Sequence, residues 1–266
     1  YGATGFVLKP QGTGLTAQKS WFMFDDEVVA LGSGITATDG KTVETIVENR
    51  KIKTEGGDNA LTVDGVTKPA ALGWNETMED VRWMHLAGNT ATGSDIGYYF
   101  PTPQTINGLR EARTGSWGDI SQSAKPDLDH QTSFTRNYLT MWVDHGNNPE
   151  NEQYSYVLLP GKSADGVETY ASSPDIEVIA NTETVHAVKE KELGITAANF
   201  WADQVAQAGI IQTDKKSSVM VQENPDSIDF SITDPVYAND GTIQVKLDVC
   251  AAQDGHTLDP AIQVTS

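Results

Sequence analysis

Short hydrophobic runs alternate with clusters of turn-forming residues along the first 70 residues. The runs are GFVLKP, SWFMFDD, VVALGSGI, VETIVENR and ALTVDG, and Gly, Asp or Asn separates them. Their content of Val, Ile, Phe and Thr predicts β-strands joined by turns. VETIVENR also fits helical spacing at Val43, Ile46 and Val47, but its β-branched content favours a strand.

The densest local pattern lies in residues 19–34, KSWFMFDDEVVALGSG. Two hydrophobic runs flank three consecutive acids, Asp25, Asp26 and Glu27. The pattern predicts two strands that meet at an acidic hairpin turn. The acids can be a solvated turn, or they can be a site for a hard cation such as calcium, because adjacent carboxylates repel one another unless something neutralises them. The pattern alone leaves both interpretations open.

The strand pattern continues to residue 160 and then changes. RWMHLAG, GYYFP, QTSFTRNYLTMWVDHG and YSYVLLPG predict strands, whereas residues 106–120 predict a long loop, with at most a helical turn in LREAR. Residues 161–175 are polar and rich in Gly, Ser, Ala and Asp, which predicts a linker. Strands resume in a smaller unit after residue 176, where ETVHAVKEKEL leaves room for one or more helical turns.

Many short strands separated by turns predict an all-β, antiparallel sandwich architecture. The chain has 266 residues, of which 38% are hydrophobic, so it can bury a substantial core. Cys250 is the only cysteine, which excludes an intrachain disulfide. The chain opens at Tyr1 without a signal peptide or a membrane-length apolar run, so we expect a fragment or a processed product.

The formal net charge of −19 limits the classes of partner. Binding to nucleic acid requires clustered Lys and Arg, and an anionic membrane surface repels so acidic a chain. The charge therefore argues against both partners. It leaves an acidic polysaccharide open, provided that a few arginines are focused in one cleft.

Candidate chemistry is sparse. The five histidines, at positions 85, 130, 145, 186 and 256, form no spaced metal motif, and no GxSxG, P-loop or GxGxxG sequence occurs. The predicted loop at 106–120 concentrates Arg110, Arg113 and Trp117. Arginine binds carboxylates and tryptophan stacks on sugar faces, so this loop is a candidate substrate contact. The alternative is that the arginines pair with the local acids Glu111 or Asp119.

Several stretches together resemble polysaccharide lyase family 8, which includes hyaluronate, chondroitin AC and xanthan lyases. The matching stretches run in order from residue 1 to about residue 201, and the later residues match more loosely. They are KSWFMFDDEVVALGSGI, VETIVENR, GYYFP, LREARTGSW, NYLTMWVDHGNNP, YSYVLLPG and NTETVHAVKEKELGITAANFW.

The resemblance implies a domain order. Such enzymes have an N-terminal α/α toroid, then a galactose-mutarotase-like antiparallel β supersandwich, then a smaller β-sandwich. It implies that residues 1–165 are the central supersandwich without its opening strands, and that residues 175–266 are the C-terminal sandwich. The toroid has no counterpart in this sequence and is the expected partner.

The resemblance also implies chemistry. The family consists of secreted bacterial enzymes that cleave acidic polysaccharides by β-elimination at a uronic acid. The Asn, His, Tyr and Arg residues that catalyse this step belong to the toroid, so no catalytic residue is expected here. We expect the chain to form one wall of the substrate cleft; the alternative is a non-catalytic carbohydrate-binding sandwich. The choice among xanthan, hyaluronan and chondroitin stays open.

Two auxiliary sites follow from the resemblance. Relatives hold calcium at the position of Asp25, Asp26 and Glu27, and a later acid near the domain junction assists, for which Glu177 is the expected counterpart. Xanthan-cleaving relatives place an arginine of the β-domain in the cleft. Arg113 is the expected counterpart, followed by Arg110.

Overall fold

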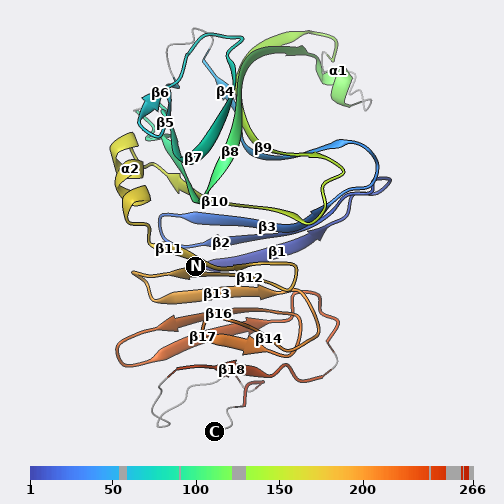
Figure 1. Cartoon of the computed structure of the whole chain (residues 1–266), viewed down its shortest axis with the longest axis vertical. Coiled ribbons are helices and arrows are strands. Elements are labelled where there is room, and N and C mark those ends of the chain that lie inside the picture. The colour runs from blue at the N-terminus through green and yellow to red at the C-terminus, as the bar shows by residue number, and fades with distance from the viewer. Residues whose placement is uncertain are drawn as a thin grey trace.

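The chain folds into two β bodies stacked along its long axis, a larger one formed by the strands up to residue 160 and a smaller one formed by the strands from residue 176 onward (Figure 1). The computed structural model describes residues 1–53, 59–89, 91–121, 130–239, 241–249, 259 and 261–263. All strand pairs in this part of the chain are antiparallel. The predicted all-β, antiparallel fold with a large sandwich before a small one is confirmed.

The larger body is a strongly curved ten-stranded sheet. Its main path runs through β1 (Gly2–Leu8), β2 (Thr16–Met23), β3 (Val28–Thr36), β10 (Glu152–Pro160), β8 (Ile96–Gly115), β7 (Asn75–Leu86), β5 (Leu61–Val63) and β6 (Val66–Thr67). Two more strands, β4 (Thr42–Ile52) and β9 (Phe134–Asn147), pair with each other, and β9 also pairs with β8.

The predicted hairpin at the acidic run is confirmed. β2 and β3 pair down to Met23 opposite Val28, and the Phe24 amide donates to the Glu27 carbonyl at 3.0 Å. Gly32 is required at its position on β3, since a Cβ there would lie 2.1 Å from Cε1 of the Tyr154 ring on β10. The close approach lets this ring lie against the β3 backbone.

The strand β8 shows that the predicted loop at residues 106–120 is wrong. β8 continues to Gly115, pairs with β7 on one side and with residues 134–142 of β9 on the other, and leaves only the short α1 (Trp117–Ile120) beyond it. Its burial alternates, with Ile106 and Arg110 buried and Leu109 only partly so. The polar residues of this stretch concealed a central strand, because Arg110 is buried and Arg113 bonds Asn49 of β4 and Thr140 of β9.

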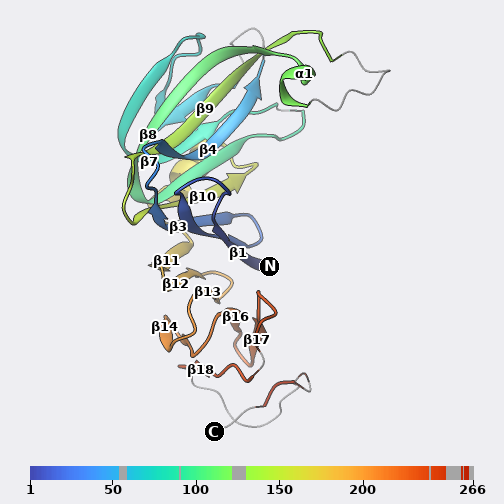
Figure 2. The ribbon, with the colours of Figure 1, turned by 90° about the vertical axis from the view of Figure 1, so that its right-hand side faces the viewer.

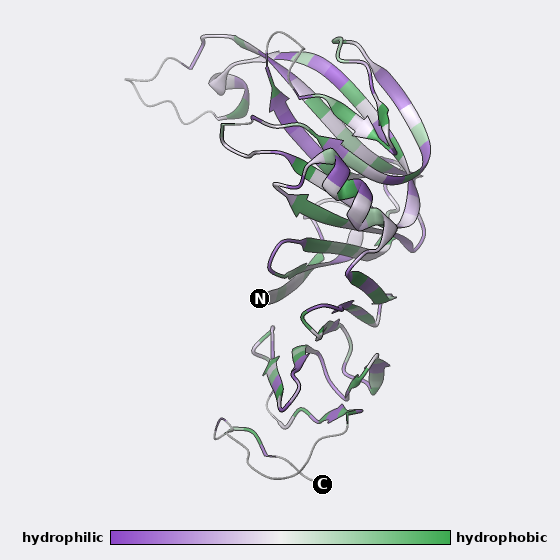
Figure 3. Ribbon diagram, turned by 90° about the vertical axis from the view of Figure 1, so that its left-hand side faces the viewer, coloured by the Kyte–Doolittle hydropathy of each residue, from purple (hydrophilic) through white to green (hydrophobic). Residues whose placement is uncertain are grey.

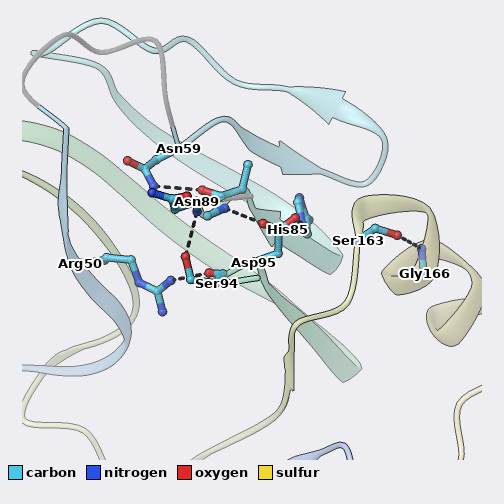
Figure 4. Close-up of polar contacts among 10 residues, drawn as sticks. Arg50, Asn59, His85, Asn89, Ser94, Asp95, Ser163 and Gly166 are labelled. Carbon is cyan, nitrogen blue, oxygen red and sulfur yellow. Dashed lines mark hydrogen bonds and ion pairs between the residues drawn. The ribbon is translucent and has the colours of Figure 1, made fainter. Parts of the chain in front are cut away.

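Residues 161–175 contain a helix where a linker was predicted. α2 (Ala164–Ser172) begins at Ser163, whose hydroxyl accepts the Gly166 amide at 3.2 Å (Figure 4). Val167 is fully buried, and a Cβ on Gly97 of β8 would lie 2.2 Å from its Cγ2 atom. The connection between the two bodies is therefore packed against the large sheet.

The smaller body has a five-stranded and a three-stranded sheet. The first is β11 (Ile176–Asn181), β12 (Val185–Glu190), β13 (Ile195–Phe200), β16 (Ser217–Glu223) and β17 (Ile228–Thr233); the second is β14 (Ala206–Ala208), β15 (Ile211–Thr213) and β18 (Val245–Leu247). ETVHAVKEKEL forms β12 and a turn, so the helical alternative is wrong. Cys250 lies outside the described residues.

Three hydrophobic clusters hold these layers together. One lies within the curved sheet, around Tyr98, Ile106 and Met141, and one fills the small sandwich, around Phe200 and Val221. The middle cluster joins β2, β3 and α2 to β12 and β13. In Figure 3 the hydrophobic colour is strong in the strands near the middle of the molecule, as this shared cluster requires. The two bodies therefore share one of their cores.

Candidate functional site

The acidic turn between β2 and β3 gathers three carboxylates. One oxygen from each of Asp25, Asp26 and Glu27 lies within 4.8 Å of the others. Asp25 and Asp26 are exposed, whereas Glu27 is only 2% exposed. The Glu27 Oε1 atom has no hydrogen-bond partner among the described residues. A buried carboxylate oxygen without a donor is an unsatisfied acceptor, which a bound cation would satisfy.

The electrostatics of the turn separate the three acids. Burial, the hydrogen bond with Asp26 and the neighbouring negative charges raise the pKa of Glu27 far above its ordinary value. Hydrogen bonds with Glu27 and Lys162 lower the pKa of Asp26, whose Oδ2 atom lies 2.5 Å from Lys162 Nζ. Without a cation, the Asp26–Glu27 pair therefore holds a proton more strongly than isolated carboxyl groups do.

The structure brings Glu190, and not Glu177, to the acidic turn. Glu177 is exposed on β11, opposite Lys189. Glu190 ends β12, is 2% exposed, and its negative charge is among the causes that raise the pKa of Glu27. Its carboxylate accepts the amides of Glu192 and Leu193. Sequence reasoning missed Glu190 because KEKEL places several charged residues in series, and only the β11–β12 register shows which one turns inward.

The donor set fits a hard cation. All the candidate ligand atoms are carboxylate oxygens, which calcium prefers, and one of them is buried without a partner. The Lys162 ammonium at the rim supplies part of the neutralisation that a cation would otherwise supply alone. The geometry of the turn is thus compatible with the cation site that the sequence left as an alternative to a solvated turn.

Arg113, on β8, is tied to three neighbours. Its guanidinium donates to Glu111 Oε1 at 2.7 Å, to Asn49 Oδ1 at 3.0 Å and to Thr140 Oγ1 at 2.8 Å. It also lies 4.6 Å from the centre of the Tyr138 ring. The alternative in which an arginine pairs with the local acid Glu111 is thus present, yet 38% of the Arg113 side chain stays exposed.

Arg110 and Trp117 have opposite environments. Arg110 is fully buried, donates from Nη2 to the Asn59 carbonyl at 2.8 Å, and has its pKa lowered by burial. A guanidinium so enclosed does not face a ligand, which corrects the expectation for Arg110. Trp117 is 62% exposed on α1, at the end of the large body far from the small one (Figure 2).

His85, His145 and His186 are engaged in side-chain contacts. His85, on β7, is 5% exposed, and its Nε2 atom lies 3.2 Å from Oδ2 of Asp95, which precedes β8 (Figure 4). The predicted packed position of His85 on a strand is confirmed. His145 bonds Thr45 Oγ1 at 2.9 Å. His186 holds a hydroxyl at each ring nitrogen, Ser20 and Ser33, both at 2.8 Å. The Ser20, Ser33 and Thr45 hydroxyls beside these rings are themselves buried, so they do not face a substrate.

Comparison with known proteins gives consistent matches along the chain. A protein-family model described as the polysaccharide lyase family 8 super-sandwich domain matches residues 1–171, and the C-terminal β-sandwich domain of the same family matches residues 177–243. A xanthan lyase from Bacillus sp. (strain GL1) is 50% identical over all of this chain, and a hyaluronate lyase from Thermasporomyces composti is 33% identical over 88% of it.

Solved structures of xanthan lyase and chondroitin AC lyase also match this chain. A Paenibacillus xanthan lyase matches 94% of this chain with a TM-score of 0.89 and 49% identity, and a Streptomyces coelicolor A3 chondroitin AC lyase, in complex with chondroitin sulphate, matches 88% with a TM-score of 0.71 and 35% identity. The chain covers 28% of each of the two relatives above, and 24% and 27% of the two solved chains. It therefore spans about a quarter of the proteins that it matches.

Proposed function

Because this chain belongs to polysaccharide lyase family 8, we propose that it is the β-domain part of an enzyme that cleaves an acidic polysaccharide by β-elimination at a uronic acid. The observation that carries the proposal is the 50% identity to a xanthan lyase over the whole chain. The relatives bear the names xanthan lyase, hyaluronate lyase and chondroitinase-AC, which makes xanthan, hyaluronan and chondroitin the candidate substrates.

Beta-elimination requires a base for the proton next to the carboxylate, a group that neutralises this carboxylate, and an acid for the leaving oxygen. His85, His145 and His186 of this chain are occupied by Asp95, Thr45, Ser20 and Ser33. We assign the base and the acid to an N-terminal α/α toroid in the same enzyme. The large difference in length from the relatives supports this assignment.

The part played by this chain is to form one wall of the substrate cleft. The end of β8 and the adjacent α1 carry Arg113 and Trp117, both partly exposed. Glu111, Asn49 and Thr140 fix the orientation of the Arg113 guanidinium, and the 38% of its side chain that stays exposed is the part that a sugar carboxylate would contact. Trp117 offers an aromatic face for stacking on a sugar ring.

Calcium at Asp25, Asp26 and Glu27, with Glu190 nearby, completes the proposal. These residues would hold the ion between the β2–β3 turn and the small sandwich. The ion would supply positive charge where four acids meet and would thereby stabilise the junction. No catalytic step depends on it. The enzyme is proposed to be extracellular, as expected for a protein that degrades a polymer too large to enter a cell.

Replacing Arg113 by Gln in the complete enzyme tests the cleft wall. We expect KM for the acidic polysaccharide to rise about tenfold or more with kcat little changed, because a charge-assisted hydrogen bond is worth about 1.5–3 kcal/mol. Initial rates of unsaturated-uronate formation measure both constants. The matched control is Arg50→Gln, which removes a partly buried arginine that pairs with Glu48 at 3.0 Å. If KM for the Arg113→Gln variant is unchanged, Arg113 does not contact the substrate in the cleft.

A further inference from the structure

Three loops meet at one end of the small sandwich. Phe200 at the end of β13 lies opposite Ser217 at the start of β16, and Ser218 lies opposite Thr233 at the end of β17. The segments that follow β13, precede β16 and follow β17 must therefore be neighbours in space. Between them is a cavity of about 270 Å³. Its lining comes from all three loops: Asp203, Lys215, Lys216, Asp234, Val236 and Asn239 are among the residues.

Hydrogen bonds between and within the loops fix the shape of the cavity. Asp203 Oδ1 accepts the Lys216 amide at 3.1 Å, which ties the first loop to the second. Lys215 Nζ donates to Asn239 Oδ1 at 2.8 Å, which ties the second loop to the third. Asp234 accepts the amides of Val236 and Asn239 at 3.1 and 2.9 Å. The cavity is therefore preorganised, which reduces the entropy cost of binding.

The charged side chains that line the cavity differ in whether they already have a partner of opposite charge or a backbone amide. The Asp234 carboxylate is occupied by backbone amides, and Asp203 is occupied by Lys216, whose Nζ atom lies 3.7 Å away. Lys215 has only the neutral Asn239 amide as a side-chain partner, and no carboxylate lies within 4.0 Å of its ammonium among the residues that the structure describes. In a chain with a net charge of −19, this partly buried cation is available to an anion.

The third loop also carries two exposed apolar side chains: Val236 lines the cavity, and Tyr237 lies between the lining residues Val236 and Ala238 in sequence. Tyr237 is 91% exposed and Val236 is 57% exposed, next to the polar lining. Tyr237 has a φ of 51°, a left-handed conformation that is unfavourable for a tyrosine and that the Asp234 hydrogen bonds around it hold in place. A polar cavity with a lysine that bonds a neutral amide, lined in part by a loop that also carries an exposed aromatic ring, offers the groups that bind a sugar carrying a carboxylate.

We propose that these loops form a second carbohydrate site, which takes a carboxylated sugar unit of the acidic polysaccharide. Lys215 binds the carboxylate, Asn239 and Asp203 bind hydroxyl groups, and Tyr237 stacks against the ring. This inference rests on the proposed function for the class of ligand, but it uses none of the residues assigned to the cleft wall. The site would hold the polymer to the small sandwich while another stretch of it occupies the cleft.

Binding to the 266-residue chain tests the site. The probes are hyaluronan and xanthan oligosaccharides, with uncharged cello-oligosaccharides of matched length for comparison. Isothermal titration should show binding of an acidic probe, and Lys215→Gln should weaken it about tenfold or more, because the lost contact is a charge-assisted hydrogen bond. Tyr237→Ala should weaken it severalfold. Lys41→Gln, which changes an exposed lysine paired with Asp39 in another turn, should leave it unchanged.

The outcomes separate the site from the proposed function. Binding that Lys215→Gln leaves intact and Arg113→Gln abolishes would place the saccharide on the cleft wall only and overturn this inference. Absence of binding by every acidic probe would overturn it as well. Neither result touches the lyase assignment, which depends on the unsaturated product of the complete enzyme.

Discussion

Removal of calcium with a strong chelator is expected to lower the Tm of the 266-residue chain by about 5–10 °C. A ligand present at about 100 times its Kd stabilises the folded state by about 2.7 kcal/mol, and a domain of this size shifts by roughly 2–4 °C per kcal/mol. The reason lies in Glu27, which is buried with one oxygen unpartnered beside two other carboxylates. Scanning calorimetry with and without chelator measures the shift.

The double substitution Asp25→Ala with Asp26→Ala is expected to abolish the response to chelator. Asp39→Ala, which removes an acid from the exposed turn after β3, should keep it. The decrease in Tm caused by chelator should also become smaller as the pH falls. The raised pKa of Glu27 means that calcium must displace a proton to bind. A parent chain whose Tm ignores both chelator and added calcium would show that the acidic turn is only a solvated turn.

Acidification below about pH 6.5 is expected to loosen the junction between the two bodies through His186. This ring is fully buried, lies 5.2 Å from the Trp201 ring, and binds Ser20 and Ser33 of the large sheet. Burial lowers its pKa from 6.5 to about 4. The unfolded chain therefore binds a proton more readily, and the stability present above pH 6.5 is lost as the pH falls toward 4.

The expected loss at pH 4.5 is about 2.5 kcal/mol from this residue alone, from the two pKa values and proton linkage. Urea unfolding between pH 7 and pH 4.5 measures it, and His186→Gln should reduce the pH dependence by that amount. Gln18→Ala, which removes an uncharged junction hydrogen bond to the Glu183 carbonyl, should lower stability equally at every pH. An identical pH dependence in the parent and the His186→Gln variant would show that the ring does not titrate in this window.

The sequence predicts most strands of the fold because apolar periodicity decides them locally. β2, β3 and β10 follow from their hydrophobic runs, and the hairpin follows from three acids that break one run in two. β8 was missed beyond residue 105 because Arg110 bonds the Asn59 carbonyl and Arg113 bonds Asn49 of β4 and Thr140 of β9, long-range contacts that no local pattern reveals. The helix α2 was missed because only tertiary packing shows that Val167 is buried.

The candidate sites differ in the same way: one is formed by residues adjacent in the sequence, and the others depend on tertiary packing. Asp25, Asp26 and Glu27 are adjacent in the sequence, so the cluster could be found from local pattern. Glu190 and the His186 contacts depend on how the small sandwich packs against β2 and β3, across more than 150 residues of sequence in the case of His186. The cavity around Lys215 combines three loops that no single sequence motif joins.

The most direct test of the account is to assay unsaturated-uronate formation from xanthan, hyaluronan and chondroitin with the 266-residue chain alone and with the complete enzyme. We expect the complete enzyme to generate unsaturated ends from at least one polysaccharide, and the chain alone to generate none, because the acid and base are assigned to the toroid. Unsaturated product from the chain alone would contradict that assignment, and release of only saturated ends by the complete enzyme would contradict the elimination reaction.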